Sequence, residues 1–301
     1  MHAPVLISVY TRLNHLKNCV ESLQANELAP QTDLFIVSDA PKFPHHLEAV
    51  TKVRNFIQTI QGFRSVTLFA WEENQGSAES IRKARLAIYE KFDTQIFMED
   101  DNVVSPFFLE YMNDALNRYR FDENVFGICG YNFSDEVPEG YPFETYFIDK
   151  ISAAGWGGWR EKYMRFFNGY TLPDFKSKAF KQYVKHAPIP ANNLKRMAKQ
   201  GAIWGDTKIS HYLYQEKMVC LFPCLSLVLN TGWDGTGEHC NKNDQWMNMP
   251  INTTKPVQSF PEKTEIDPAW ARQIQQFFSY PFLGKLKTAL FDYKARLKKR
   301  F

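Results

Sequence analysis

The chain has 301 residues and a formal net charge of +3, and 44% of its residues are hydrophobic and 15% aromatic. This apolar content is enough for one large α/β domain, so it excludes a globally disordered chain. The near-neutral charge excludes a general polyanion-binding surface, so we expect no nucleic-acid partner.

The first hundred residues alternate short apolar runs with helical patterns, which predicts a parallel sheet wrapped by helices. The expected order is βαβαβαβ. Strands are predicted at residues 5–10, 34–37, 66–71 and 95–98, and helices at 13–24, 45–61 and 78–92.

After residue 101, aromatic residues, glycines and prolines become more frequent. We expect a tight Gly-Trp turn that opens a helix over 155–167, a strand pair within 218–228 broken at Pro223, and loops over 134–144 and 232–264. The remaining predictions are a strand at 125–130 and helices at 107–119, 175–186, 192–199 and 206–215.

Three consecutive acidic residues, Glu99, Asp100 and Asp101, follow the predicted strand 95–98. Ligands of open α/β sheets bind beyond the carboxyl ends of the strands, which is where this triplet is expected. Adjacent carboxylates repel one another unless a cation compensates them, and hard oxygen ligands favour Mg²⁺ or Mn²⁺. The pattern favours a metal site, and the alternative is a solvated acidic turn or helix cap.

Polar residues also follow the first two predicted strands, where Arg12 and Asp39 stand. At adjacent strand ends, Asp39 would accept a hydrogen bond from a base or ribose, and Arg12 would pair with a base or phosphate. Taken singly, each is more often a helix cap or a surface charge.

A polar turn from Asn74 to Ser77 opens the helix predicted from residue 78. Free N–H groups and the positive dipole end of a helix suit phosphate or ribose contacts. Plain capping by Ser77 and Ser80 is the alternative.

The ordered combination of these motifs resembles the nucleotide-binding half of GT-A glycosyltransferases. Their order and spacing are similar to family 2, and the E-D-D triplet is similar to that of N-acetylglucosaminyltransferase I. The resemblance covers residues 4–240 and rests on Tyr10-Thr11-Arg12, Ser38-Asp39, Asn74-x-Gly76 with Arg82, and Glu99-Asp100-Asp101.

The resemblance implies a GT-A fold, which is an α/β fold with a Rossmann-like mixed sheet and helices on both faces. It implies a catalytic domain over 1–264, with a nucleotide-binding half at 1–101 and an acceptor-binding half at 102–264, followed by an extension at 265–301. Asp101 would bind Mn²⁺ or Mg²⁺ directly, with Glu99 behind it. Nucleotide contacts are expected from Tyr10, Arg12, Asp39, Asn74, Gly76, Arg82 and Asp100.

Glycines and indole rings gather between Ala154 and Trp159. Glycine allows close backbone approach, and indole faces stack on sugar rings. Trp156, Gly157 and Trp159 are therefore candidates for contact with the donor or acceptor sugar, as is Trp204. The alternative is that the indoles anchor the core.

Asp206 begins a predicted helix, where inverting GT-A enzymes carry their catalytic base. Inverting transfer needs one carboxylate to take the proton of the acceptor hydroxyl. Capping of the helix is the alternative role for Asp206.

The segment Asn230–Cys240 looks like the N-x-G-x-D-G-S/T-G-x-H-C segment of bacterial sugar transferases. Its glycines predict a mobile loop that closes over a diphosphate. His239 is a candidate metal ligand or phosphate donor, and a non-functional loop histidine is the alternative.

The tail from Phe282 onward reads as a basic amphipathic helix, because Leu286, Leu290, Tyr293 and Leu297 recur at helical spacing among lysines and arginines. We expect it to contact an anionic membrane surface, or to dock on the body of the protein.

The compartment is expected to be the cytoplasm, and the alternative is the cytoplasm with peripheral attachment to the inner face of the membrane. Five scattered cysteines without a C-x-x-C pair indicate a reducing environment, and neither a signal-peptide pattern nor a membrane-spanning run is present.

The sequence therefore predicts a metal-dependent inverting glycosyltransferase that moves a hexosyl or N-acetylhexosaminyl group. Its expected partners are a nucleotide-diphospho-sugar donor, by resemblance a UDP-sugar, and a glycan or lipid-linked acceptor of bacterial surface polysaccharide synthesis. A glycan-binding module without catalysis and a sugar-phosphate nucleotidyltransferase are the alternatives.

Overall fold

The first half of the chain folds in the predicted βαβαβαβ order. The structure, a computed structural model, describes residues 2–201, 205–236 and 249–279. The elements are β1 (Val5–Val9), α1 (Leu13–Gln24), β2 (Asp33–Ser38), α2 (Leu47–Ile57), β3 (Ser65–Ala70), α3 (Ser77–Tyr89) and β4 (Thr94–Glu99).

The second half adds strands to the same sheet and helices around it. In chain order these elements are β5 (Asn102–Val104), α4 (Phe108–Arg118), β6 (Val125–Cys129), β7 (Thr145–Ile148), β8 (Trp156–Trp159), α5 (Arg160–Gly169), α6 (Lys178–His186), α7 (Pro188–Gln200), α8 (Gly205–Glu216), β9 (Val219–Pro223), β10 (Val228–Asn230) and α10 (Pro268–Gln275).

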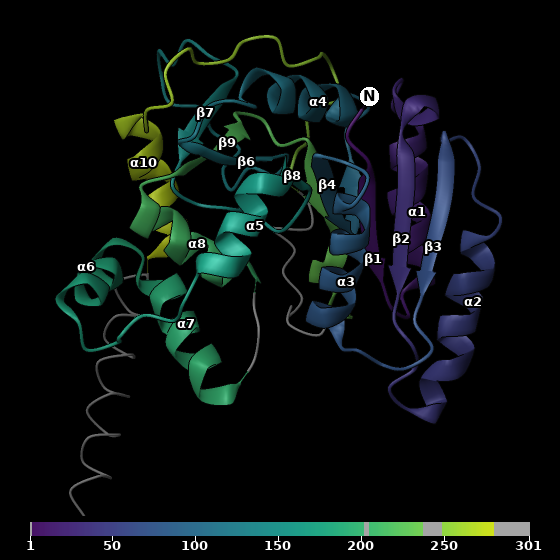
Figure 1. Cartoon of the computed structure of the whole chain (residues 1–301). Coiled ribbons are helices and arrows are strands. Elements are labelled where there is room, and N and C mark those ends of the chain that lie inside the picture. The colour runs from purple at the N-terminus through teal and green to yellow at the C-terminus, as the bar shows by residue number, and fades with distance from the viewer. Residues whose placement is uncertain (1, 202–204, 237–248, 280–301) are drawn as a thin grey trace, which may run out of the picture.

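The main sheet has eight strands in the order β3-β2-β1-β4-β8-β6-β9-β7. Strands β1 to β4 are parallel, β8 is antiparallel to both β4 and β6, and β7 is antiparallel to β9. This mixed sheet with helices on both faces confirms the predicted α/β fold class. The carboxyl ends of β1 to β4 lie at the lower edge in Figure 1.

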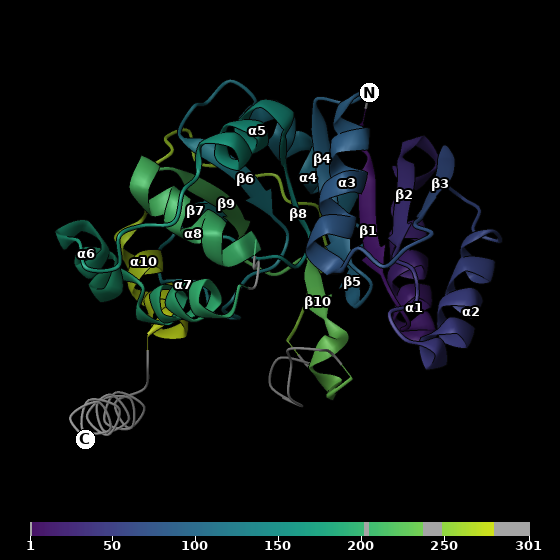
Figure 2. The same cartoon turned by 60° about the horizontal axis from the view of Figure 1, so that its bottom comes forward.

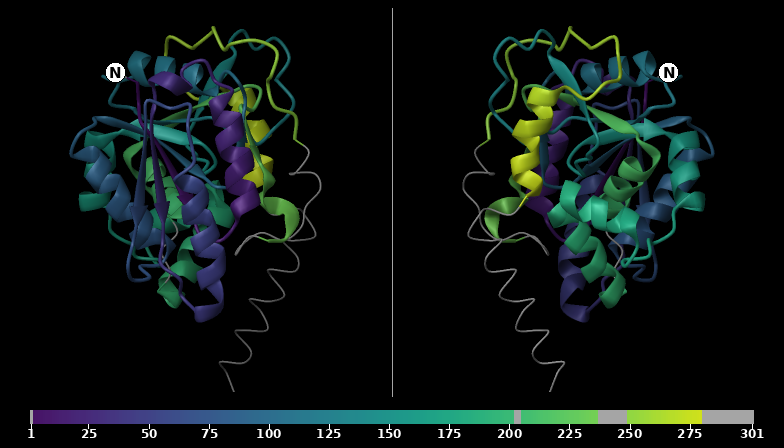
Figure 3. Two further views of the ribbon diagram at one scale, coloured as in Figure 1. Left: turned by 90° about the vertical axis from the view of Figure 1, so that its right-hand side faces the viewer. Right: turned by 90° about the vertical axis from the view of Figure 1, so that its left-hand side faces the viewer.

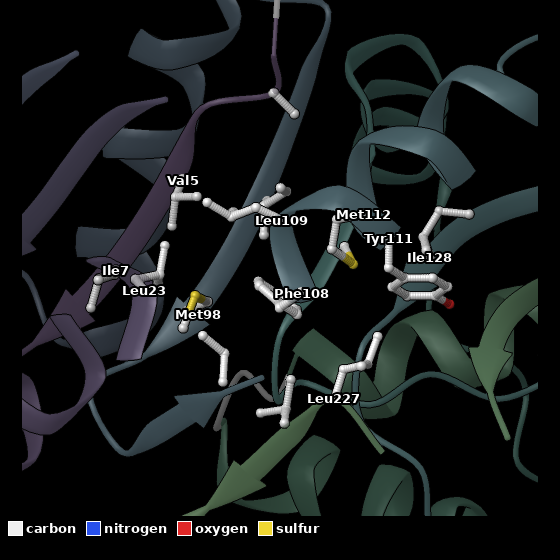
Figure 4. Packing of buried hydrophobic residues seen from close by; sticks show 14 of the residues in the cluster. Val5, Ile7, Leu23, Met98, Phe108, Leu109, Tyr111, Met112, Ile128 and Leu227 are labelled. Carbon is white, nitrogen blue, oxygen red and sulfur yellow. The ribbon is translucent and has the colours of Figure 1, made fainter. Parts of the chain in front are cut away.

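Successive side chains along the strands point to opposite faces of the sheet and pack into two separate hydrophobic cores. In β1, Val5 and Ile7 point into the core that α1 and α4 cover, whereas Leu6 points into the core of α3 and α5. Figure 3 shows α1 and α3 on opposite sides of the sheet, and Figure 4 shows Phe108 of α4 between Met98 and Leu227 in the first of these cores. Because both faces are covered, an open site is expected at the strand ends.

The segment 155–167 contains the predicted helix, α5 (Arg160–Gly169), but its first part is not the predicted turn. Its first part is β8, a fully buried strand between β4 and β6. A Cβ on Gly157 would lie 2.9 Å from Met112 Cε and 3.2 Å from the Gln95 carbonyl oxygen. The glycines are needed because this strand is packed tightly on both faces of the sheet.

The prediction for 218–228 is confirmed for one strand, β9, which ends at Pro223, but the second strand, β10, begins only at Val228 and pairs elsewhere. Strand β9 joins the main sheet beside β6 and β7, whereas β10 leaves it and pairs with β5. The prediction missed β5, which follows the acidic triplet directly. As a result, β10 is attached next to Glu99–Asp101, at the edge that faces the viewer in Figure 2.

Helix α10 packs on the sheet through Trp270. Its fully buried indole stacks on Tyr146 of β7 with a centroid distance of 3.8 Å. The amphipathic helix predicted from Phe282 lies outside the described residues. Among the described helices, none is long and apolar enough to cross a membrane.

Candidate active site

The acidic triplet lies at the carboxyl end of a central parallel strand. Strand β4 ends at Glu99, which is in register with Ser8 of β1, and the Asp100 amide donates to the Ser8 carbonyl oxygen at 3.1 Å. Asp100 and Asp101 are buried, with exposed fractions of 4% and 7%. Two carboxylates are thereby held side by side at the sheet edge where ligands bind.

Arg12 contacts both buried carboxylates. Its Nη2 donates to Asp101 Oδ2 at 2.8 Å and to Asp100 Oδ1, and its Nε donates to Asp100 Oδ2 at 3.2 Å. The side chain of Arg12 is 23% exposed. The structure therefore brings together three predicted site residues, with one guanidinium bridging the two aspartates.

The pKa values of two carboxyl groups in the triplet, Glu99 and Asp100, are raised. Burial raises the pKa of Glu99 to about 8, and repulsion from Asp101, Asp100 and Asp206 acts in the same direction. Burial also raises the pKa of Asp100 to about 6, although the Arg12 guanidinium opposes that shift. Perturbed carboxyl groups of this kind are typical of functional sites, because burial and like charges are tolerated there.

Asp206 lies within electrostatic reach of this cluster. It is exposed in the first turn of α8, its Oδ1 accepts the Thr207 amide at 2.7 Å, and its charge contributes to the raised pKa of Glu99. A carboxylate at a helix N-terminus is stabilised in its ionised form. The structure thus places the predicted base at the same end of the sheet as the predicted metal ligands.

The start of the Asn230–Cys240 segment packs directly on the triplet. The Thr231 amide and Oγ1 donate to the Asp101 carbonyl oxygen at 2.8 and 2.9 Å. A Cβ on Gly232 would lie 2.1 Å from Asp101 Oδ2. The segment therefore covers Asp101 from one side, and only glycine fits at the contact.

Three residues of this site, Asn102, His15 and Gly232, were not singled out by any sequence pattern. Asn102 donates to Asp101 Oδ1 at 2.9 Å, and His15 Nε2 lies 3.1 Å from Asp234 Oδ2. Gly232 was one of three glycines in a loop, without a signal that singled it out. His15 stands one helical turn after Arg12, and this spacing alone could have placed it beside the site.

Asp39 organises the residues at the carboxyl end of β2. Its carboxylate accepts the Gln75 amide at 2.9 Å and the Asn74 side-chain amide at 3.1 Å, and Asn74 also donates to the Ala40 carbonyl oxygen at 2.7 Å. Two of the predicted nucleotide residues, Asp39 and Asn74, therefore lie in hydrogen-bond contact, and the Asp39 carboxylate fixes the turn before α3.

Tyr10 and Gly76 both lie in segments that follow carboxyl ends of the parallel strands, after β1 and after β3. The Tyr10 hydroxyl accepts the Lys42 amide at 2.7 Å and lies 2.7 Å from His46 Nδ1. Gly76 has a φ of 76° and caps α3, and a Cβ there would meet open space. The chain thus makes its turn at Gly76 with the left-handed backbone that glycine favours.

Arg82 makes different contacts from the other predicted nucleotide residues. It forms an ion pair with Glu79 on α3, and its guanidinium lies over the Phe167 ring at 5.7 Å. Its described partners therefore belong to α3 and α5 rather than to the acidic triplet.

The structure places the two predicted sugar-binding indoles in the core. Trp156 and Trp159 are 6% and 4% exposed. Trp156 stacks on Phe126 and under the Arg85 guanidinium, and Lys162 lies over Trp159. Gly157 lies between them in the strand. The buried rings present no face to a sugar, and we leave all three residues out of the sugar site. Trp204 and His239 lie outside the described residues.

The chemistry of the triplet fits a hard divalent cation. In the described part of the chain, no group of three or more His, Cys, Asp or Glu side chains has the arrangement of a metal site. The oxygens of Asp100 and Asp101 nevertheless converge on one cationic group, the guanidinium of Arg12. Carboxylate oxygens that already hold a cation in common are a suitable donor set for Mg²⁺ or Mn²⁺.

Comparison with known proteins finds solved structures of low sequence identity. No protein-family model and no curated protein matches the sequence. Similar solved structures include S. aureus TarS (16% identity, TM-score 0.36, 59% of this chain and 32% of that chain) and S. aureus TarS 1–349 (16%, 0.36, 59% and 52%). A third is the mannosyltransferase PcManGT from Pyrobaculum calidifontis in complex with GDP-Man and Mn²⁺ (14%, 0.39, 57% and 47%). The chain spans about a third to a half of the length of these chains.

Proposed function

We propose that the chain is a metal-dependent inverting glycosyltransferase. It would move a sugar from a nucleotide-diphospho-sugar, with a UDP-sugar favoured by the sequence resemblance, to a glycan or glycolipid acceptor in bacterial surface polysaccharide synthesis. The observation that supports this most directly is the pair of buried carboxylates, Asp100 and Asp101, at the end of β4, with Asp206 within electrostatic reach of the same cluster.

The proposed metal ligand is Asp101, with Asp100 and Glu99 beside it. When bound there, Mn²⁺ or Mg²⁺ would neutralise the charge that develops on the leaving nucleoside diphosphate. Asn102 and Thr231 would keep Asp101 in place, because one donates to its carboxylate and the other to its carbonyl oxygen. Asp39, Asn74 and Tyr10 are the proposed contacts of the nucleoside.

Asp206 is the proposed catalytic base. The acceptor oxygen would bond to the anomeric carbon while the bond from that carbon to the diphosphate breaks, and the electron pair of the broken bond would leave with the diphosphate. The acceptor proton would pass to the Asp206 carboxylate. The Thr207 amide that donates to Asp206 Oδ1 holds this carboxylate at the start of α8. Attack from the face opposite the leaving group inverts the anomeric carbon.

A thermal-shift screen of nucleotide sugars, with and without Mn²⁺, tests the proposal. We expect one donor to raise the melting temperature only when the metal is present. That donor then serves in a transfer assay with proton NMR of the product, in which Asp206→Asn should keep donor binding and lose transfer at least a hundredfold. A glycan that stabilises the protein without metal, together with no response to any donor, would favour a glycan-binding module instead.

We also propose that the tail attaches the enzyme to an anionic membrane surface. This proposal rests on the basic amphipathic pattern after Phe282 alone. Each basic residue near the surface would contribute about 1 kcal/mol. A chain that ends at Pro281 should lose its binding to phosphatidylglycerol vesicles in a sedimentation assay, and unchanged binding would remove the proposal.

A further inference from the structure

We infer that Arg12 is the resting counter-ion of the acidic site, and that a divalent metal binds Asp101 only after the Arg12 guanidinium has been displaced. This inference rests on the proposed function, because it concerns the order in which that site takes up its metal and its donor. It assigns to Arg12 a positioning role before the reaction, in addition to the pairing with a base or phosphate that the sequence suggests.

The contacts of Asp101 leave its carboxylate oxygens already engaged by the protein. Oδ2 accepts from Arg12 Nη2 at 2.8 Å, and Oδ1 accepts from Asn102 Nδ2 at 2.9 Å. Gly232 also lies against Oδ2. A Cβ added to Gly232 would be only 2.1 Å from this oxygen, so the backbone of Gly232 covers a further side of it. A cation that approaches Oδ2 therefore meets the guanidinium before it meets the oxygen.

The metal ion and the Arg12 guanidinium compete directly for the Asp101 carboxylate, because both are positively charged. A metal ion held by the Asp101 carboxylate would share its oxygen ligand with the Arg12 guanidinium, which bonds to the same carboxylate. Two positive charges on one carboxylate repel one another strongly in a partly buried site. Loss of a proton from Arg12 cannot relieve this repulsion, since a guanidinium stays charged in proteins. It therefore has to move.

The position of Arg12 allows that movement. The residue stands at the N-cap of α1 with no side-chain capping bond, and its side chain is 23% exposed. The guanidinium suits bidentate pairing with phosphate oxygens as well as with carboxylates. A nucleoside diphosphate that arrives at the strand ends would give Arg12 a second anionic partner while the metal takes the first. Metal and nucleotide should therefore help each other to bind.

Direct Mn²⁺ titration tests this inference without any turnover. Free Mn²⁺ is measured by electron paramagnetic resonance with the full chain, first without nucleotide and then with UDP. The wild type should bind Mn²⁺ weakly alone and at least tenfold more tightly with UDP. Arg12→Ala and Arg12→Gln should bind Mn²⁺ alone at least tenfold more tightly than the wild type, and UDP should then add much less. Arg12→Lys should lie between.

Arg64→Ala is the matched control. Arg64 forms the same two-point ion pair with a buried aspartate, Asp33, at the opposite ends of the strands, where it touches none of the site residues. Its Mn²⁺ affinity should equal that of the wild type. Circular dichroism of each variant shows whether it is folded, and Arg12→Gln provides a second test should Arg12→Ala unfold.

Two negative results are distinguishable. If the wild type binds Mn²⁺ with UDP while the Arg12 variants bind the metal alone no more tightly than the wild type, the inference is wrong and the proposed function stands. If neither the wild type nor the variants bind Mn²⁺ alone, with UDP or with the nucleotide of any donor found in the screen, the proposed function is wrong and the inference falls with it.

Discussion

Glu99 makes the stability of the protein depend on pH in a direction opposite to that of most carboxylates. Its pKa is raised from 4.5 in an ordinary environment to about 8 in the fold, chiefly by burial. Between these two values the folded chain keeps a proton that the unfolded chain has lost. The free energy of unfolding therefore decreases as pH rises through this window, by at most about 1.4 kcal/mol per pH unit for a single group.

The expected result is a lower melting temperature at pH 8 than at pH 6.5 in a chelating buffer. Titration of His211 does not contribute in this window. Burial lowers the pKa of His211 from 6.5 to about 4, so its effect on the free energy of unfolding is confined to pH values below 6.5. Glu99→Gln should show a smaller decrease between the two pH values. Equal decreases in the variant and the wild type, measured by differential scanning calorimetry, would exclude Glu99 as the cause.

Gly232 is the position at which a single methyl group should damage the site most. A Cβ there would overlap Asp101 Oδ2, which Arg12 also holds. Gly232→Ala should therefore displace the carboxylate and weaken Mn²⁺-dependent donor binding at least tenfold, as measured by calorimetric titration.

A suitable control for that variant is Gly169→Ala. Residue 169 ends α5, and a Cβ there would meet no atom within 4 Å beyond its chain neighbours and the nearby backbone of its own helix. Its donor binding should match that of the wild type. Unchanged donor binding in Gly232→Ala as well would mean that the 231–234 contact with Asp101 has no part in the site.

At the scale of residues, the sequence indicates which charged residues belong to the candidate site, but it does not indicate which side chains they contact. The acidic triplet, Arg12 and Asp39 stand out because strand ends gather ligands. That Arg12 bonds to the triplet, and that Gly232 presses on Asp101, depends on side-chain packing between segments far apart in the chain. The indoles of Trp156 and Trp159 misled the prediction for the same reason, since a buried and an exposed tryptophan look alike in a sequence.

At the scale of elements, β8 is held in place by glycines that face neighbouring backbone. A Cβ on Gly127 of β6 would lie 2.9 Å from the Gly157 carbonyl oxygen of β8. Backbone at the centre of a sheet cannot move aside cheaply. Gly127→Ala should lower the free energy of unfolding by about 1–3 kcal/mol, whereas Gly169→Ala should change it by less than about 0.5 kcal/mol.

Urea unfolding of both variants measures this difference. The comparison matters because alanine is otherwise better tolerated than glycine in regular structure. Equal stability of the two variants would contradict the tight packing of β8 between its neighbours.

The elements of the first half follow from the sequence because periodicity determines them. Strand β1 and helix α1 carry regular apolar spacing, and α1 spans Leu13–Gln24 as predicted. By contrast, β5 and β10 have only three residues each and are formed by pairing with each other across more than a hundred residues. Such strands have no local signal, because their partner determines them.

At the scale of the whole molecule, the candidate site is where the two halves of the chain meet. Residues before 102 supply Arg12 and the triplet, and residues after 102 supply Thr231, Gly232 and Asp206. The pairing of β5 with β10 joins the halves next to Asp101. This arrangement places a segment from late in the chain against Asp101, the proposed metal ligand at the end of β4.

The most direct test of the account is calorimetric titration of UDP, or of the donor found in the screen, with Mn²⁺ and in a chelator, using the wild type and Asp101→Asn. Asparagine keeps the shape of the side chain and removes its charge. We predict that the wild type binds at least tenfold more tightly with Mn²⁺ than in the chelator, and that Asp101→Asn loses this gain. Equal binding by both proteins in Mn²⁺, or full transfer activity in the chelator, would contradict a metal site at the end of β4.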